Sequence, residues 1–246
     1  MSTLKVDGLR AGVSGREIIT GVDLELRSGE VHVLMGPNGS GKSTLANVLM
    51  GRPGYNVLGG SACLDGVDLL GLPTWQRVKA GLFLTMQEPI EVPGVTTLDA
   101  LSAALGDGGQ LVGGKMDVSG SLAREATRLG LAERLLARPL NVDLSGGESK
   151  RNEVVQLAVL RPRFAVLDEI DSGLDVDALS AVAHRVMEAT AEWGLGVLAI
   201  THYQRLLSVL HPDRVHVLVR GRIVASGGAD LAEEVERTGY AELAGL

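Results

Sequence analysis

Short apolar runs alternate along this chain with segments of helical periodicity. Phe164–Leu167 and Gly196–Ile200 are continuous apolar runs, and Val31–Met35 is interrupted only by a histidine. Runs of this length are typical of parallel strands that are covered on both faces. From Lys42 to Met50 the apolar positions recur at the spacing of one helix face. The alternation predicts an α/β fold built around a parallel sheet.

The two flanks of this pattern differ from it. Val215–Val219 and Ile223–Ala225 surround a glycine-containing turn, which predicts an antiparallel pair of strands. The middle of the chain opens with Pro89 and Pro93 and is then expected to turn helical. Within it, the glycine-rich Gly106–Gly114 predicts a surface loop, whereas the mixed leucines and charges of 124–138 predict a solvated helix or a pair of helices.

Charge and cysteine content narrow the possible functions. The net charge of −7 argues against a broad grip on nucleic acid, which needs a basic face. The single Cys63 excludes an intrachain disulfide, and one thiol cannot hold an iron–sulfur cluster alone. No apolar run approaches the ~18 residues that span a bilayer, and the first residues lack the apolar run of a signal peptide. We therefore expect a cytoplasmic protein with no nucleic-acid partner and no direct membrane insertion.

A phosphate-binding loop follows the run Val31–Met35. The segment GPNGSGKS matches G-x-x-x-x-G-K-[ST] between an expected strand and an expected helix. The glycines let backbone N–H groups curl around phosphate oxygens, and the helix presents its positive end. Lys42 can then reach the β and γ phosphates, and the Ser43 hydroxyl can bind Mg²⁺. The candidate ATP-binding residues are Gly36, Pro37, Asn38, Gly39, Ser40, Gly41, Lys42, Ser43 and Thr44.

Two carboxylates end the apolar run Phe164–Leu167. Asp168 and Glu169 follow it directly. A strand-end aspartate beside a phosphate loop can hold the metal, so we assign Asp168 to Mg²⁺. Successive side chains point differently, and we assign Glu169 as the general base that acts on the attacking water.

Further segments resemble the motifs of the ATP-binding-cassette (ABC) ATPases. Leu144–Glu148 reads LSGGE and is similar to the family signature LSGGQ, with Glu148 in place of the glutamine. Gln87 fits the Q-loop of that family. Ser172–Asp175 fits its D-loop, and Thr201–His202 fits its H-loop. Together with the phosphate loop and the carboxylate pair, these motifs stand in the family's order.

The resemblance implies a fold and a division of the chain. The fold is a RecA-like parallel-sheet core with an antiparallel β edge and an inserted helical subdomain. The core would comprise residues 1–87 and 161–246, and the helical subdomain, which carries the signature, residues 88–160.

The resemblance also implies roles and cofactors, namely ATP and Mg²⁺. Gln87 would contact Mg²⁺ or the attacking water, His202 would contact the γ-phosphate, and Asp175 would belong to the D-loop. The start of the signature helix offers free N–H groups that favour an anion. In the family this anion lies in the opposite protomer, so hydrolysis requires two copies arranged head to tail. The signature residues are Ser145, Gly146, Gly147 and Glu148.

Longer strings are similar to one branch of the family, the ATPases of the SUF iron–sulfur cluster assembly system. They are Gln87–Val95, Ser145–Glu153, Leu167–Leu179, Thr201–Leu207 and His216–Val224. This resemblance implies soluble scaffold partners, SufB and SufD, that ATP-driven dimerisation would reshape. The alternative is the nucleotide-binding subunit of a membrane ABC transporter, because the apolar segment after Gln87 would suit either partner. A chromosome-maintenance ATPase would need a long coiled coil, which the 56 residues between Gln87 and Leu144 cannot supply.

Overall fold

The structure is a computed structural model that describes residues 1–87, 89–106, 117–201 and 204–240. Two sequence predictions lie outside these residues. They are the loop in the interior of Gly106–Gly114 and the position of His202.

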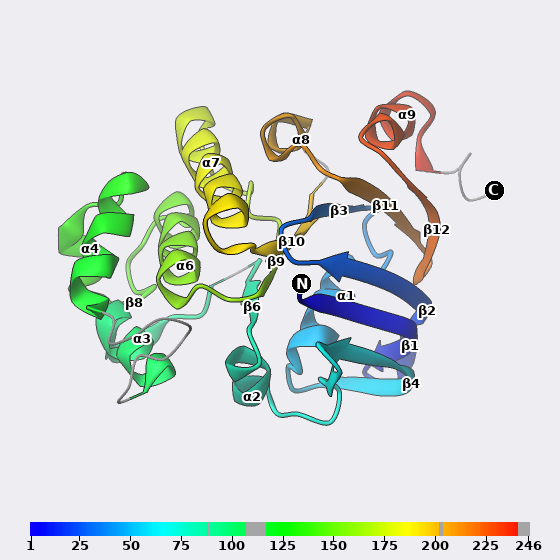
Figure 1. Ribbon diagram of the computed structural model, residues 1–246, viewed down its shortest axis with the longest axis horizontal. Coiled ribbons are helices and arrows are strands. Elements are labelled where there is room, and N and C mark those ends of the chain that lie inside the picture. The colour runs from blue at the N-terminus through cyan, green and yellow to red at the C-terminus, as the bar shows by residue number, and fades with distance from the viewer. Residues whose placement is uncertain (88, 107–116, 202–203, 241–246) are drawn as a thin grey trace.

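The main sheet has six strands in the order β12-β11-β3-β10-β9-β6 (Figure 1). All neighbours in it are parallel except the antiparallel pair β11 and β12. Every residue of β3, β9 and β10 is buried, as parallel strands with both faces covered require. The predicted parallel core and the predicted terminal strand pair are therefore confirmed. The strands are β3 Val31–Met35, β6 Leu82–Thr85, β9 Phe164–Asp168, β10 Gly196–Ile200, β11 Arg214–Val219 and β12 Arg222–Gly227.

A second, antiparallel sheet packs on one side of the main sheet, in the order β2-β1-β4-β5. Its strands are β1 Thr3–Val13, β2 Arg16–Arg27, β4 Tyr55–Leu64 and β5 Val67–Asp68. Helix α1, Lys42–Met50, lies between the two sheets, where Leu45 and Leu49 join one core cluster with Leu34, Val166 and Leu198 of the main sheet. The start of this helix is the edge of the phosphate loop, so the loop is anchored by both sheets.

The opposite face of the main sheet is covered by helices (Figure 1). They are α6 Gly146–Leu160, α7 Val176–Trp193, α8 Gln204–Leu210 and α9 Asp230–Thr238. The residues of β3 and β9 that point to this side, such as Val33 and Leu167, belong to a second core cluster. Adjacent strand residues thus enter two different cores, because successive side chains point to opposite faces. The short helix α2, Thr74–Lys79, precedes β6.

The middle of the chain turns helical after its two prolines, as its sequence predicts, but it also contains two short strands. Around Pro93 the chain forms β7, Val92–Thr96, which pairs antiparallel with β8, Pro139–Leu140. This strand pair is absent from the sequence prediction, because the partner strand lies more than 40 residues away and the local pattern carries no sign of it. The expected helix of 124–138 is a pair that breaks at Gly130. The helices here are α3 Thr97–Leu105, α4 Val118–Arg128 and α5 Glu133–Leu136.

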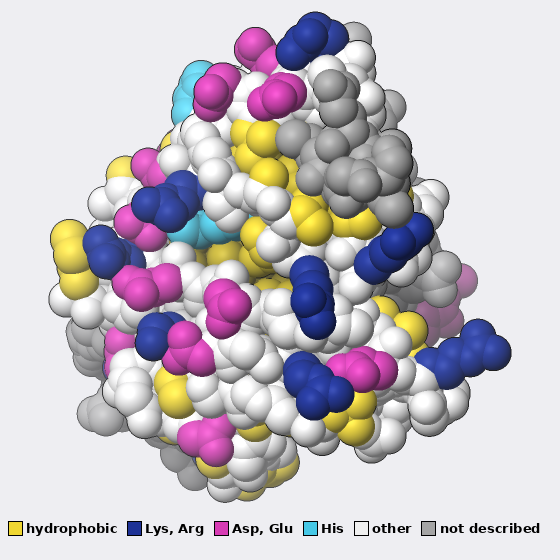
Figure 2. Space-filling view, turned by 90° about the vertical axis from the view of Figure 1, so that its right-hand side faces the viewer, with side chains coloured by type: hydrophobic (Ala, Val, Ile, Leu, Met, Phe, Trp, Pro, Cys, Tyr) yellow, Lys and Arg dark blue, Asp and Glu magenta, His cyan; other side chains and the backbone are white. Residues whose placement is uncertain are grey.

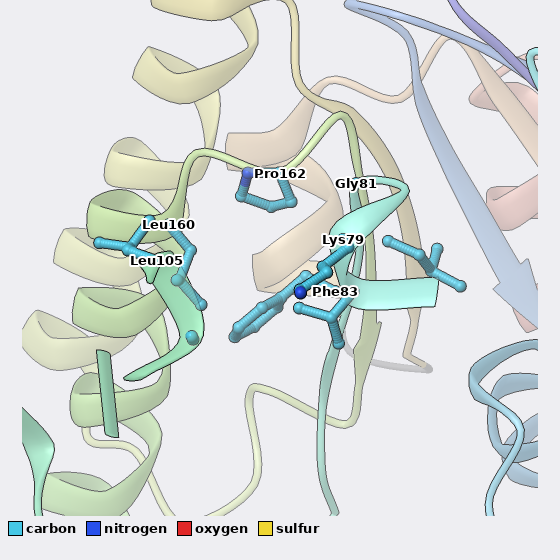
Figure 3. A pocket seen from close by; sticks show the side chains of 9 residues that line it. Lys79, Gly81, Phe83, Leu105, Leu160 and Pro162 are labelled. Atoms are coloured by element: carbon cyan, nitrogen blue, oxygen red, sulfur yellow. The ribbon is translucent and has the colours of Figure 1, made fainter. Parts of the chain in front are cut away.

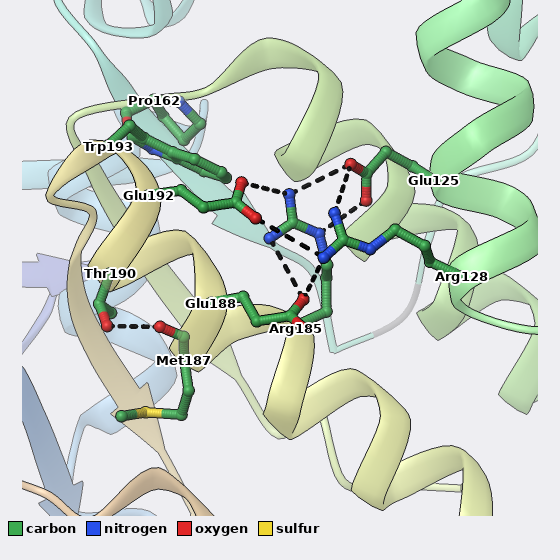
Figure 4. Close-up of polar contacts among 9 residues, drawn as sticks. All are labelled: Glu125, Arg128, Pro162, Arg185, Met187, Glu188, Thr190, Glu192 and Trp193. Atoms are coloured by element: carbon green, nitrogen blue, oxygen red, sulfur yellow. Dashed lines mark hydrogen bonds and ion pairs between the residues drawn. The ribbon is translucent and has the colours of Figure 1, made fainter.

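A charged cluster joins α4 to α7 (Figure 4). Arg185 is 2% exposed, and its Nε lies 2.6 Å from Oε2 of Glu125. Its Nη2 lies 3.3 Å from Glu192, and Arg128 pairs with Glu188 at 2.6 Å. Because each buried charge faces an opposite one, the cluster fixes how the two helices pack.

The face in Figure 2 carries charges of both signs. Acidic and basic side chains are interspersed on it, with hydrophobic side chains gathered in a hollow between them. Within the described residues, no helix is both long enough and apolar enough to cross a membrane.

The side chain of Arg77, in α2, caps the C-terminal end of α1, the helix that follows the phosphate loop. Its side chain is buried, and its Nη1 donates to the carbonyl oxygens of Val48 and Leu49 at 2.7 and 2.8 Å. Nε and Nη2 donate to Leu72 and Leu70. The last carbonyls of a helix have no partner inside it, so this guanidinium satisfies groups that burial would otherwise leave unpaired.

We expect Arg77→Met to lower the free energy of unfolding by about 3 kcal/mol, because it leaves several buried carbonyls without a donor. Urea unfolding of the two proteins measures this difference. Lys79→Met, on the exposed side of the same helix, is the control and should change stability by no more than about 0.5 kcal/mol. An Arg77 variant as stable as this control would show that the carbonyls find other partners.

Two buried histidines face each other in the main sheet. His216 Nε2 lies 3.1 Å from His32 Nδ1, and the other ring nitrogen of His216 lies 2.7 Å from Ser226 Oγ. Burial lowers the pKa of His216 to about 4, with smaller effects in the same direction from His32 and Arg214. Burial also lowers the pKa of His32, against the opposing effect of Glu30. The pair is therefore neutral in the folded chain at pH 7.

We expect acid to destabilise the fold through His216. Below pH 6.5 the unfolded chain binds a proton that the folded chain excludes until about pH 4. The free energy of unfolding therefore falls as the pH is lowered from about 6.5 to about 4, by roughly 3 kcal/mol for this group. Denaturant titrations of the wild type and His216→Gln between pH 4 and 7.5 test this. The variant curve should be flatter, whereas replacement of the exposed His184 should leave it unchanged.

Candidate functional site

The phosphate loop lies at the carboxyl end of β3. It runs from Gly36 to Gly41, and α1 begins at Lys42 as the sequence predicts. Gly41 has φ 111°, and a Cβ there would lie 2.8 Å from the side chain of Ile19. A Cβ on Gly36 would lie 2.2 Å from the carbonyl oxygen of Leu218. Side chains at these two positions are sterically excluded, which leaves the backbone amides accessible at the start of the helix.

Lys42 is folded back onto this loop. Its Nζ donates to the carbonyl oxygens of Gly36 and Pro37, at 2.8 and 3.1 Å. Burial lowers the pKa of Lys42, while the nearby carboxylates of Asp168 and Glu169 act against that shift. A phosphate in the loop would offer the ammonium group stronger, charged acceptors than these carbonyls.

Ser40 provides a further test of whether a phosphate fits. Its Oγ is buried and has no hydrogen-bond partner among the described residues. A buried hydroxyl normally has a partner. A phosphate oxygen would supply one, so the loop fits the predicted nucleotide phosphates.

Ser43 and Asp168 meet across the site. Ser43 Oγ donates to Asp168 Oδ1 at 3.3 Å. Asp168 is 3% exposed, and burial raises its pKa, with an opposing effect from Ser43. Hydroxyl and carboxylate oxygens are ligands that Mg²⁺ accepts, and a cation beside Asp168 would favour its charged form. The two residues therefore fit the metal.

Glu169 and Gln87 form the next contact. Gln87 Nε2 donates to Glu169 Oε2 at 2.8 Å, although the two residues are 82 positions apart. Glu169 has φ 49°, an uncommon value for a residue with a side chain. Its N–H donates to the carbonyl oxygen of Ile200 at 3.0 Å, which holds the turn after β9 against β10. The structure thus brings together the glutamine predicted for the Q-loop and the predicted general base.

The signature lies on a different part of the chain. Ser145 caps α6, its Oγ accepts from the N–H of Glu148 at 3.3 Å, and Glu148 Oε2 accepts from the Ser145 N–H at 2.8 Å. The N–H and the hydroxyl of Ser145 both donate to the Glu148 carboxylate, which lowers the pKa of Glu148 and keeps its carboxylate on the cap. Among the described residues, no hydrogen bond joins Ser145–Glu148 to the phosphate loop. Figure 1 places α6 beside α4 and α7, apart from α1.

The segment predicted as the D-loop borders the predicted signature of the same chain. A Cβ on Gly147 would lie 3.2 Å from the carbonyl oxygen of Gly173. Asp175 caps α7 by accepting from the N–H of Ala178 at 2.8 Å. Thr201, which precedes His202, is buried at the end of β10.

Sequence reasoning missed three residues next to the site. Lys150 and Glu153 of α6 contact the backbone of Met86, the residue before Gln87. Tyr240 lies half-buried beside the backbone of Gly36, and burial raises its pKa. Lys150 and Glu153 have the i, i+3 spacing of many exposed helical ion pairs, so their sequence gives no sign that they are buried. Tyr240 stands in no motif.

Comparisons with known proteins agree with this geometry. The family model described as ABC transporter matches residues 19–172. A probable ABC transporter ATP-binding protein of Streptococcus pyogenes is 47% identical, over 99% of this chain and 96% of its own length. Vegetative protein 296 of Bacillus subtilis is 46% identical, over 97% and 92%. A probable ATP-dependent transporter of Synechocystis is 44% identical, over 96% and 94%.

Solved structures share the fold. The ATP-binding subunit of an ABC transporter superposes with a TM-score of 0.81 at 24% identity, over 98% of this chain and 99% of that chain. A dimeric bacterial ABC transporter cassette gives a TM-score of 0.77 at 20% identity, over 92% and 98%. The predicted fold class is confirmed by these matches. The family model matches more than half of this chain, and the relatives named above match nearly all of it. The chain therefore belongs to the ABC transporter family of ATP-binding cassettes and is an ABC-type ATPase.

Proposed function

We propose that this chain is SufC, the ATP-hydrolysing subunit of the SUF iron–sulfur cluster assembly complex. In this proposal, ATP drives two copies together head to tail, and their closure reshapes a SufB–SufD scaffold. The observation that carries the ATPase part is the contact of Gln87 with Glu169 beside the Ser43–Asp168 pair and the phosphate loop. The SUF part rests on the strings that resemble the ATPases of that system.

The proposed mechanism assigns the groups around the phosphates. The loop amides of 36–41 and Lys42 bind the triphosphate, with Thr44 in the same turn. Ser43, Asp168 and Gln87 would hold Mg²⁺, which neutralises charge on the β and γ phosphates when bound. Positioning the phosphates next to Glu169 is the protein's main contribution to catalysis.

Glu169 acts as the general base. Its carboxylate orients the attacking water and accepts its proton, while the amide of Gln87 holds the carboxylate in place. His202 is proposed to contact the γ-phosphate. The signature residues Ser145–Glu148 lie away from the phosphate loop of their own chain, which supports a site completed by a second copy, with Asp175 near that boundary.

A groove beside the core supports docking of a partner (Figure 3). It has a volume of about 280 Å³ between α2, β6, α3 and the end of α6, and apolar side chains such as Phe83, Leu105 and Leu160 line it. Trp75, on the same helix as the lining residue Lys79, is 58% exposed. Exposed aromatic residues next to apolar grooves are common at protein interfaces. We propose that a scaffold segment packs here.

The names of the relatives favour a second candidate, the nucleotide-binding subunit of a membrane ABC transporter. Fractionation and co-purification of the native protein distinguish the two. Co-elution from the soluble fraction with SufB and SufD, identified by mass spectrometry, is the expected result. Pelleting with a membrane-spanning subunit instead would favour the transporter and refute the SUF assignment.

A further inference from the structure

Two ionisable side chains of α6 hold both backbone groups of Met86. Glu153 Oε1 accepts from the Met86 N–H at 2.7 Å, and Lys150 Nζ donates to the Met86 carbonyl oxygen. The two side chains lie 3.6 Å apart and are 3% and 5% exposed, respectively, for Lys150 and Glu153. We call Lys150 and Glu153 the Met86 clamp.

Fold stability does not explain a buried pair of this kind. Replacing a buried ion pair with apolar side chains of similar size is often neutral or stabilising, because desolvation offsets the attraction between the charges. Burial raises the pKa of Glu153 to about 7, and its Oε2 has no hydrogen-bond partner within the described chain. The clear structural consequence of the pair is the fixed geometry of Met86.

That geometry decides where Gln87 lies. The peptide bond is planar, so the backbone has two free dihedral angles per residue. Lys150 holds the peptide plane between Met86 and Gln87, and Glu153 holds the plane before Met86. The Cα of Gln87 is therefore positioned by α6, and its amide reaches Glu169 at 2.8 Å.

The same helix begins at the signature. Ser145 caps α6, and the clamp lies five and eight residues later. At 1.5 Å per residue, the clamp is roughly 7–12 Å along the helix from Ser145. We infer that Lys150 and Glu153 are positioning residues that tie the signature helix to Gln87, so that a movement of Ser145 against the nucleotide of a second copy shifts the glutamine that holds Glu169. This inference rests on the proposed composite ATPase site.

The test replaces the clamp as a pair. The variant Lys150→Met/Glu153→Leu removes both bonds to Met86 and leaves no buried charge unpaired, so it is expected to fold. MgATP should bind to it with wild-type affinity, because the phosphate loop is untouched. Turnover at saturating MgATP should fall on the order of 10- to 100-fold, the loss that a misplaced positioning group causes. In the nucleotide-free chain, hydrogen–deuterium exchange at the Met86 amide should be at least about tenfold faster.

Arg185→Met/Glu125→Leu is the matched control. It also replaces a buried pair of charges, one that joins α4 to α7 and does not touch Met86. Turnover and Met86 exchange of this variant should match the wild type. Wild-type turnover of the clamp variant, or unchanged exchange at Met86, would overturn the inference, as would equal losses of turnover and nucleotide affinity. A wild-type chain without ATPase activity would refute the proposed function instead, while Met86 exchange would still test the clamp.

Discussion

Glu169→Gln is expected to bind MgATP normally and to lower its turnover by about 100- to 10,000-fold, the contribution of a general base. Glutamine has nearly the shape of glutamate, so the contact with the amide of Gln87 can be kept by rotation of the new side chain. It cannot accept the proton of the attacking water. Single-turnover kinetics and equilibrium binding of ATP, measured on the same preparation, separate these two effects.

The same variant should accumulate as a two-chain complex. Hydrolysis would normally open the closed pair, so a chain that binds ATP without hydrolysing it remains closed. Size-exclusion chromatography in MgATP detects this form. The exposed Glu234→Gln is the matched control, which should turn over ATP like the wild type and show no added dimer. A Glu169 variant that stays monomeric in saturating MgATP would contradict a site shared by two copies, and one with full turnover would contradict the assignment of the base.

The parts of this fold that the sequence predicts are those whose pattern is local. The run Val31–Met35 and the helix that starts at Lys42 are found because burial on both faces, or on one helical face, sets the residue type at every position. The phosphate loop is found because only glycine fits at Gly36 and Gly41. In each case the pattern itself is contained in about ten neighbouring residues, although the atoms that exclude a side chain at Gly36 and Gly41 belong to the distant Leu218 and Ile19.

The parts that escape prediction depend on residues far apart in the chain. The pairing of β7 with β8 is set by tertiary contacts, and neither strand has a strong pattern of its own. Arg77 and Lys150 resemble surface residues in sequence, because charged side chains are rarely buried. Their roles arise from carbonyl groups that the fold brings to them.

The departure of the signature from its family pattern has a local explanation. Glu148 stands where the family has glutamine, and it forms a capping box with Ser145. Both residue types can make this box, since each offers a side-chain oxygen to the N–H of the capping residue. The carboxylate is thus held on the cap, and Ser145 keeps its place at the exposed start of α6.

Lys42→Ala is expected to weaken MgATP binding at least about 30-fold, because it removes the cation that would pair with the phosphates. The lysine is 7% exposed and already lies within the loop, where it donates to Gly36 and Pro37. It therefore needs only a change of acceptor, and no large movement, to bind a triphosphate.

Isothermal titration calorimetry with MgATP measures this loss, and Lys79→Ala, an exposed lysine of α2, is its control. The loss should be larger for ATP than for ADP, since the ammonium group is expected to reach both the β and γ phosphates. Unfolding of the variant by urea should stay close to the wild type, which separates lost binding from lost folding. If Lys42→Ala bound MgATP as tightly as the control, the loop between β3 and α1 would not be the nucleotide site. The roles proposed for Ser43, Asp168 and Glu169 would then be contradicted as well, because each depends on phosphates bound in that loop.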